Sequence, residues 1–258
     1  MADLLIAEKP SASEKIAKAL ADGKVSKKTE KGVSYYEIDH NGKEILVACA
    51  VGHLYTIAET KKQKWSYPIF DVNWEESSEA SKSAVYTKKY LDVIKKLAKK
   101  ADEITISTDY DIEGETIGLN IVRFACNRKD ANRMKFSTLT KDELVNSYEN
   151  ASSHLDWPQA EAGETRHFLD FYFGINLSRA LTLSIKNSTG SFKLMSSGRV
   201  QGPTLKILAD REREIIAFKP VPFWQIGIKT ENSITAFHEE GKFFDKKKAE
   251  SIFQKIKD

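Results

Sequence analysis

Hydrophobic and polar positions follow two different periods along the first 150 residues. Residues 3–7 form a short apolar run, and residues 103–108 alternate β-branched and polar side chains, as strands do. Each run is followed by an amphipathic helical pattern, over residues 11–23 after the first and from Gly114 after the second. Repeated strand and helix patterns of this kind predict an α/β fold, a mostly parallel sheet with helices on both faces.

Other elements are predicted between and after these two strand–helix patterns. Ser11 and Glu14 match a capping box at the start of the first helix. The polar, aromatic stretch over residues 60–83 is predicted to be an irregular surface loop. The remaining predicted elements are strands over 35–39 and 43–51 around a turn at Asn41-Gly42, a helix over 88–99, a strand over 133–136 and a helix over 140–148.

The pattern changes after residue 150. A long helical region is predicted over residues 159–186, interrupted at Gly174, and a second helix over 203–216. The loop between them is rich in glycine and serine. Strand-like runs after residue 223 and a lysine-rich helix after Asp245 indicate the beginning of a β domain.

Composition changes this picture little. Charged residues make up 30% of the chain and the net charge is +3, which neither requires nor excludes a nucleic-acid partner. All arginines lie between residues 123 and 213, and their clustering is equally consistent with phosphate binding and with helix surface. Two isolated cysteines, Cys49 and Cys126, predict a reduced cytoplasmic protein without disulfides. No apolar stretch approaches the roughly 18 residues of a membrane-spanning helix, so we expect no membrane partner.

Three acidic residues follow the strand at 103–108. Asp109, Asp111 and Glu113 are spaced by two, so they point the same way for as long as the backbone stays extended. Crowded carboxylates repel one another, and Mg²⁺ relieves that repulsion. Acids in the first turn of a helix are the plain alternative. Glu8 follows the first strand, and we expect it to meet this group at the same edge of the sheet.

Five segments together resemble the N-terminal half of type IA DNA topoisomerases, in particular the archaeal topoisomerase I and topoisomerase III branch. The resemblance covers residues 3–230, whereas the acids alone would indicate only a Toprim domain, which primases and some nucleases also carry. The segments are Glu8-Lys-Pro-Ser11, Gly52-His-Leu54, Thr108-Asp-Tyr-Asp-Ile-Glu-Gly-Glu115, Gly174-Ile-Asn-Leu-Ser-Arg-Ala-Leu-Thr182 and Ser197-Gly-Arg-Val-Gln201.

The resemblance implies a Toprim domain over residues 1–150, a helical DNA-binding domain over 151–216 and the start of a β-rich arch over 217–258. Enzymes of this family are isomerases that cleave one DNA strand through a 5′-phosphotyrosyl bond, pass another strand and reseal the first. They relax negatively supercoiled DNA with Mg²⁺ and without a nucleotide cofactor. We therefore expect a monomer whose partner is single-stranded DNA.

The family's site residues map onto named positions. Glu8 is expected to act as general acid or base at the departing 3′ oxygen, and Lys9 to offset charge on the scissile phosphate. The expected Mg²⁺ ligands are Asp109 and Asp111, with support from Glu113 and Glu8. Ile112 stands where the family usually has an arginine, and Lys9 and Arg133 are the candidates to replace that charge.

The expected DNA contacts come from three places. His53 matches the Gly-His-Leu segment, and Arg166 and Asp170 match strand-binding positions on the long helix. His167 stands where bacterial relatives have a second arginine, so its contribution is left open. Each contact has a structural alternative. His53 could be a loop histidine without a ligand, Arg166 and Asp170 could form an ion pair on the helix surface, and the loop could serve only as a connection. The glycine-rich loop supplies the remaining contacts, Ser196, Ser197, Gly198, Arg199, Val200 and Gln201.

The family's nucleophile is a tyrosine in a Tyr-x-Arg-Thr segment, and none of the nine tyrosines is followed in this way. We therefore expect an N-terminal fragment that lacks the nucleophile and is inactive alone. Two other functions remain open at this point. One is a free-standing Toprim nuclease that uses metal-activated water, and the other is a DNA-binding module without catalysis.

Overall fold

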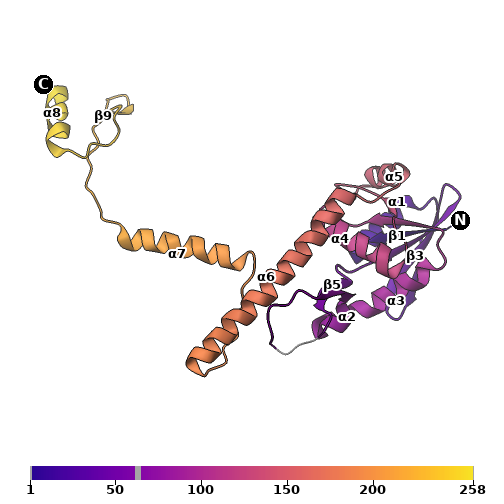
Figure 1. Cartoon of the computed structure of the whole chain (residues 1–258). Coiled ribbons are helices and arrows are strands. Elements are labelled where there is room, and N and C mark those ends of the chain that lie inside the picture. Colours follow the sequence, from indigo (N-terminus) through magenta and orange to yellow (C-terminus); the bar gives the residue numbers. More distant parts are fainter. Residues whose placement is uncertain (1, 62–64, 258) are drawn as a thin grey trace. The chain divides into compact units, whose positions relative to one another are not determined.

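The computed structural model describes residues 2–61 and 65–257, which divide into two units, one up to Arg199 and one from Val200 onward. The first unit is built on a six-stranded sheet in the order β2-β3-β4-β1-β7-β8 (Figure 1). Its strands are β1 (Ala2–Ala7), β2 (Ser26–Glu30), β3 (Val33–His40), β4 (Lys43–Cys49), β7 (Glu103–Ser107) and β8 (Asn132–Arg133). A separate ribbon pairs β5 (Tyr55–Glu59) with β6 (Val72–Glu76).

The middle of the sheet is parallel, as predicted. Strand β1 pairs in parallel with β4 and β7, and β7 pairs in parallel with β8, whereas β3 pairs antiparallel with both β2 and β4. In this register Ala7 lies opposite both Cys49 and Ser107. The three central strands therefore end level with one another, at one edge of the sheet.

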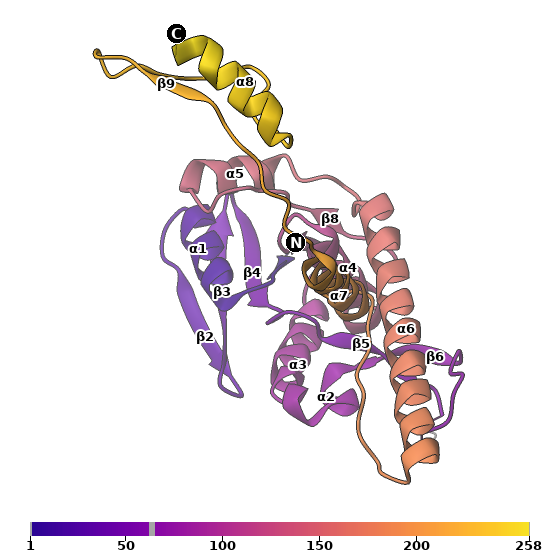
Figure 2. The same cartoon turned by 90° about the vertical axis from the view of Figure 1, so that its left-hand side faces the viewer.

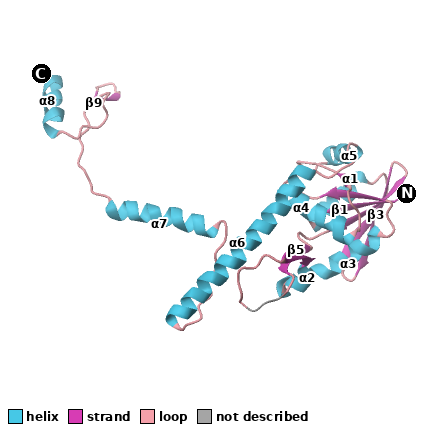
Figure 3. Cartoon of the chain, viewed as in Figure 1, coloured by secondary structure: helices cyan, strands magenta, loops and turns pink. Residues whose placement is uncertain are grey.

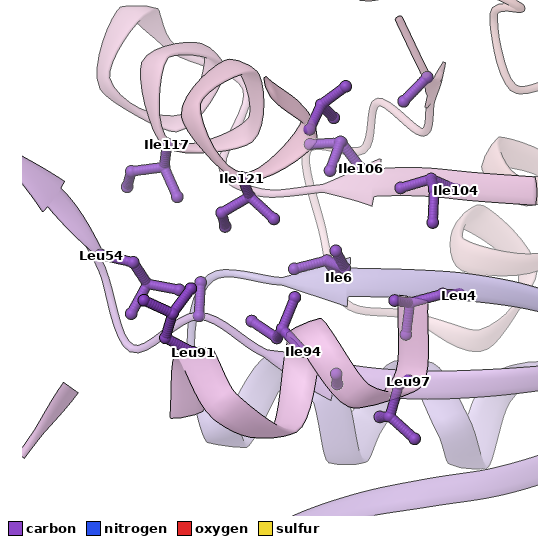
Figure 4. Close-up of a cluster of buried hydrophobic side chains, with 14 of the residues drawn as sticks. Leu4, Ile6, Leu54, Leu91, Ile94, Leu97, Ile104, Ile106, Ile117 and Ile121 are labelled. Carbon is purple, nitrogen blue, oxygen red and sulfur yellow. The ribbon is translucent and has the colours of Figure 1, made fainter. Parts of the chain in front are cut away.

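Helices cover both faces of the sheet. On β1, Leu4 and Ile6 face the core formed with α3 (Thr87–Ala98) and α4 (Ile112–Asn120), which Figure 4 shows in close-up. Leu5 and Ala7 face the opposite core, with α1 (Pro10–Leu20) and α5 (Lys141–Glu149). The continuous apolar run of β1 follows from this burial on both sides. The α/β prediction is confirmed.

The long helix α6 (Trp157–Thr189) packs against α4 and touches β5 (Figure 1 and Figure 2). The two helices approach closely because Gly163 has no side chain; a Cβ there would lie 2.0 Å from Oγ1 of Thr116. The predicted interruption at Gly174 is wrong, since α6 is continuous over 33 residues and ends at Gly190 in the left-handed conformation.

The second unit begins with α7 (Gln201–Ala217). It continues with the antiparallel pair of β9 (Gly227–Lys229) and β10 (Thr235–Phe237) and ends with α8 (Lys246–Lys257), as Figure 3 shows. A small core of Ile226, Phe243 and Ala249 holds these last elements together. The strands and helix predicted after residue 223 are present. The domain boundaries at 150 and 216 stay a prediction.

Two other local predictions were wrong. The capping box at Ser11 does not form, because the N-cap of α1 is Lys9, two residues earlier, and Glu14 instead pairs with Lys18 at 2.5 Å. The loop predicted over residues 60–83 contains β6, α2 (Ser77–Ala80) and the 3₁₀ turn η1 (Lys82–Ala84), while residues 62–64 lie outside the described part. In the described ranges no helix has the length and apolarity needed to cross a membrane.

Candidate catalytic and metal-binding site

Glu8, Lys9 and Asp109 meet where β1 and β7 end. The ammonium nitrogen of Lys9 lies 2.6 Å from Oδ2 of Asp109 and 3.6 Å from Oε1 of Glu8. The backbone N–H of Asp109 donates to Oε2 of Glu8 at 3.4 Å. The hydrogen bond to Asp109 and the charge of Glu8 raise the pKa of Lys9 above its usual value. The site therefore pairs two carboxylates with a cation at the sheet edge where ligands bind in open α/β folds.

Asp111 does not pair with Lys9 as Asp109 does. It caps α4, and its Oδ1 accepts a hydrogen bond from the N–H of Gly114 at 2.7 Å. The turn is so tight that a Cβ on Gly114 would lie 2.0 Å from the carbonyl oxygen of Asp109. Because α4 begins at Ile112, the extended backbone that would align all three acids ends before Glu113. The prediction that the three acids point the same way by strand spacing is therefore wrong.

Arg133 holds this turn from inside the protein. Its side chain is fully buried, and its Nε lies 2.6 Å from Oε2 of Glu115. The two terminal nitrogens of its guanidinium donate to the carbonyl oxygens of Thr108 and Asp109, each at 3.0 Å. A guanidinium bound in this way cannot reach a phosphate, so the suggestion that Arg133 replaces the arginine missing at Ile112 is wrong. Lys9 is the exposed cation beside the acids.

Glu113 lies among basic side chains. Its Oε2 is 3.1 Å from Nε2 of His53 and 3.1 Å from Nε2 of His167, and its Oε1 is 2.9 Å from Arg166. His53 comes from the turn after β4, where Val51 has a φ of 60°. Burial and the neighbouring His167 lower the pKa of His53. Sequence spacing could not reveal this cluster, because its members are far apart along the chain.

The predicted positions on α6 meet the glycine-rich loop. Two guanidinium nitrogens of Arg199, Nε and Nη2, donate to the carboxylate of Asp170. Nε of Arg166 lies 3.6 Å from the same carboxylate. The hydrogen bond from Arg199 lowers the pKa of Asp170. Through Arg166, this group of charges continues to Glu113. The structure thus brings Arg199 of the loop to Arg166 and Asp170, which were predicted as neighbours on the long helix.

The segment before Arg199 runs back along α6 and is tied to it by two hydroxyl groups. Ser178 accepts from the N–H of Ser197 at 2.9 Å, and Thr182 accepts from the N–H of Met195 at 3.0 Å. Both positions lie in the segment 174–182 of the resemblance, but the sequence reasoning assigned them no role. Ser196 and Gly198 lie in the same segment. Val200 and Gln201 belong to the second unit, at the start of α7.

Two kinds of candidate cation ligand are present. The oxygen atoms of Glu8, Asp109 and Asp111 are hard ligands of the kind that Mg²⁺ prefers. Among the described residues, three ligand atoms of histidine, cysteine or acidic side chains gather within 4.8 Å of one another only at His53, Glu113 and His167. Of the four acids predicted as Mg²⁺ ligands, Glu8, Asp109, Asp111 and Glu113, Glu113 belongs to this group; that the four share one ion stays a prediction.

Known proteins resemble this chain over its whole length. Residues 3–139 match the Toprim domain family, and residues 154–258 match the DNA topoisomerase family. DNA topoisomerase 1 of Methanocaldococcus jannaschii is 48% identical over 259 residues, which cover 100% of this chain and 33% of that protein. DNA topoisomerase 1 of Pyrococcus furiosus is 46% identical over 98% of this chain and 24% of its own length.

The fold has a counterpart among solved structures. Full-length topoisomerase I from Thermotoga maritima matches with a TM-score of 0.64 and 26% identity, over 96% of this chain and 37% of that one. This chain therefore spans only about a third of the length of such relatives.

Proposed function

Because this chain belongs to the type IA DNA topoisomerase family and carries a Toprim domain, we propose that it supplies the acid–base and metal-binding part of a DNA strand-cleavage centre. In the whole enzyme this centre would cut and reseal one strand and so relax negatively supercoiled DNA. The observation that supports the proposal is the meeting of Glu8, Lys9 and Asp109 at the carboxyl ends of β1 and β7.

Two side chains act directly on the strand in this proposal. The side chain of Lys9 is 56% exposed, so its ammonium can reach a phosphate from its place beside Asp109. It offsets charge that develops on the scissile phosphate. Glu8 is 16% exposed and lies next to Lys9, where its carboxyl group can give a proton to the departing 3′ oxygen and take it back on resealing.

The oxygen atoms at this edge fit Mg²⁺. Asp109 and Asp111 would hold the ion, with Glu8 beside them, because carboxylate oxygens are its preferred protein ligands. Bound Mg²⁺ supplies positive charge that positions the scissile phosphate during cleavage and resealing. Glu113, the remaining predicted ligand, contacts two histidines and Arg166.

The proposed DNA path follows α6 away from the acids. His53, Arg166, Asp170 and Arg199 form a continuous polar chain from Glu113 to the loop. An arginine fork can donate two parallel hydrogen bonds to one phosphate, which suits a single strand that crosses this face. The other proposed contacts are Ser196, Ser197, Gly198, Val200 and Gln201. We propose that the protein works as a cytoplasmic monomer and needs no nucleotide cofactor.

The attacking tyrosine is proposed to come from sequence outside these 258 residues, since none of the nine tyrosines stands in a Tyr-x-Arg-Thr segment. The first test incubates the chain with Mg²⁺ and a labelled single strand and then denatures the protein. We expect neither a covalent adduct nor nicks. Free nicks would favour a water-using Toprim nuclease, and an adduct would place the nucleophile among these tyrosines.

A chimera gives the positive test. The chain replaces the matching 259 residues of the Methanocaldococcus jannaschii enzyme, which it resembles at 48% identity. We expect the chimera to relax negatively supercoiled plasmid with Mg²⁺, and Glu8→Gln to abolish relaxation. Lys28→Ala on β2, which is at the far edge of the sheet, is the matched control and should keep full activity. Equal activity of the Glu8→Gln chimera would refute the assignment.

A further inference from the structure

His53, Glu113 and His167 form a compact group with the donor atoms of a transition-metal site. The Nε2 atoms of both histidines lie 3.1 Å from the same oxygen, Oε2 of Glu113. The three side chains come from the turn after β4, the first turn of α4 and the middle of α6. All three ligand atoms lie within 4.8 Å of one another. Three separate elements thus direct their donors to one point.

The chemistry of the donors separates this group from the neighbouring acids. Two imidazole nitrogens and one carboxylate oxygen are a common ligand set for Zn²⁺, whereas Mg²⁺ takes oxygen ligands and water. Two ligands that are each 2.0–2.1 Å from a tetrahedral ion lie about 3.4 Å apart. The observed 3.1 Å between each Nε2 and Oε2 is close to that separation, so two of the three ligand pairs are already spaced as in a tetrahedral site.

The surroundings hold each ligand in place. Arg166 binds Oε1 of Glu113 at 2.9 Å and leaves Oε2 for an ion. The ring of His167 packs 4.9 Å from that of His53 and 5.6 Å from that of Trp74, between centroids. Nδ1 of His53 is buried and makes no hydrogen bond to the described residues, so Nε2 is the nitrogen through which this ring can bind. A ligating carboxylate that is itself bound by a neighbour, as Glu113 is by Arg166, is typical of known metal sites.

We propose that His53, Glu113 and His167 form a Zn²⁺ site that is distinct from the oxygen ligands of Asp109 and Asp111. The side chains of the three ligands are 24–35% exposed, so the ion can enter from solvent and water can take the fourth position. The proposal needs no DNA cleavage by this chain, and it stands or falls separately from the proposed function.

The test is a calorimetric titration of the 258-residue chain with Zn²⁺ in excess Mg²⁺. We expect one Zn²⁺ per chain and a loss of affinity of at least about 100-fold in His167→Ala and in His53→Ala, because each removes a ligand. His154→Ala is the matched control; this exposed histidine pairs with Asp130 and should bind Zn²⁺ as the wild type does. Asp111→Asn should also leave Zn²⁺ binding unchanged.

A second measurement guards against unfolded variants. Co²⁺ in place of Zn²⁺ should give visible absorption of a low-coordinate nitrogen and oxygen site, and Glu113→Gln should remove it while the far-ultraviolet circular dichroism stays the same. Wild-type affinity in His167→Ala would overturn the proposal. A fall in Zn²⁺ affinity in Asp111→Asn equal to that in His167→Ala would also overturn it, because the ion would then belong to the acids.

Discussion

At the scale of single residues, the informative one is Arg133, which looks like a phosphate ligand in the sequence and is a buried support in the structure. Replacing it with methionine keeps most of the volume but leaves the carboxylate of Glu115 buried without its partner. Breaking such a pair costs about 3–5 kcal/mol. We expect Arg133→Met to lower the free energy of unfolding by about that amount in urea denaturation.

The exposed Arg128 provides the comparison. Arg128→Met should change the free energy of unfolding by no more than about 0.5 kcal/mol, as most surface substitutions do. If Arg133→Met were as mild as this control, the pair with Glu115 would not be what holds the turn that carries Asp109.

Asp3 gives a prediction about pH. It is buried and accepts hydrogen bonds from Thr105 and Tyr148, and burial raises its pKa above the usual value. A carboxyl whose pKa is higher in the folded state stabilises the fold fully below its unfolded pKa, about 3.9, and loses that contribution as the pH rises through the folded pKa. The stability of the wild type relative to Asp3→Asn should therefore be lower when measured at about pH 7 than at about pH 4.

Urea denaturation of both proteins at the two pH values measures the difference. The exposed Asp92, which pairs with Lys31, serves as control, and Asp92→Asn should not show the same fall. A relative stability of the wild type that rises with pH would mean that Asp3 is favoured as the charged form.

At the scale of elements, the segment before Arg199 is held against α6 by hydrogen bonds to two hydroxyl groups of that helix. Ser178→Ala with Thr182→Val removes the acceptors for the N–H groups of Ser197 and Met195 and keeps the side-chain volumes similar. Each lost hydrogen bond is worth about 1 kcal/mol. We expect much faster hydrogen exchange at these two amides, measured by NMR or mass spectrometry, with the amides of the α6 core unchanged.

Ser188→Ala is the matched control, because that hydroxyl donates to the carbonyl of Ile185 within the helix. Unchanged exchange at residues 195 and 197 in the double variant would show that the segment is held by other contacts.

The strands and helices differ in how well the sequence predicts them. Strands β1 and β7 were predictable because they are buried on both faces and read as apolar or alternating runs. Strand β2 was missed because Ser26–Glu30 is a polar edge strand whose pairing depends on β3. Gly174 suggested a break, but glycine is tolerated within a long packed helix.

The candidate site was predictable only in part. Glu8 and Asp109 follow directly from the rule that parallel strands end at one edge. The neighbours of Glu113 do not follow from it, because His53 and His167 lie 60 and 54 positions away and arrive through tertiary packing. The sequence locates acids at strand ends well, and it does not show which partner each acid takes.

At the scale of the whole molecule, binding of a single strand should depend strongly on salt. Each phosphate contact contributes about 0.7 to the slope of log K against log salt for single strands. We expect Arg199→Ala to weaken binding and to reduce that slope by about 0.7, in fluorescence anisotropy titrations over a range of salt. Lys28→Ala on the edge strand β2 should leave affinity and slope as they are. An unchanged slope in Arg199→Ala would remove this arginine from the proposed DNA path.

The position of β1 between β4 and β7 has a consequence for biosynthesis. The partners of β1 lie 42 residues away in β4 and 100 residues away in β7, counted from Ala2 to Glu44 and from Asp3 to Glu103. Ribosomes add roughly 5–20 residues per second, so β1 waits several seconds with one apolar edge unpaired. Nascent chains that have not passed Asp109 cannot hold Glu8 and Lys9 in their final surroundings. The site is completed late, and until then the open edge of β1 is a target for chaperones.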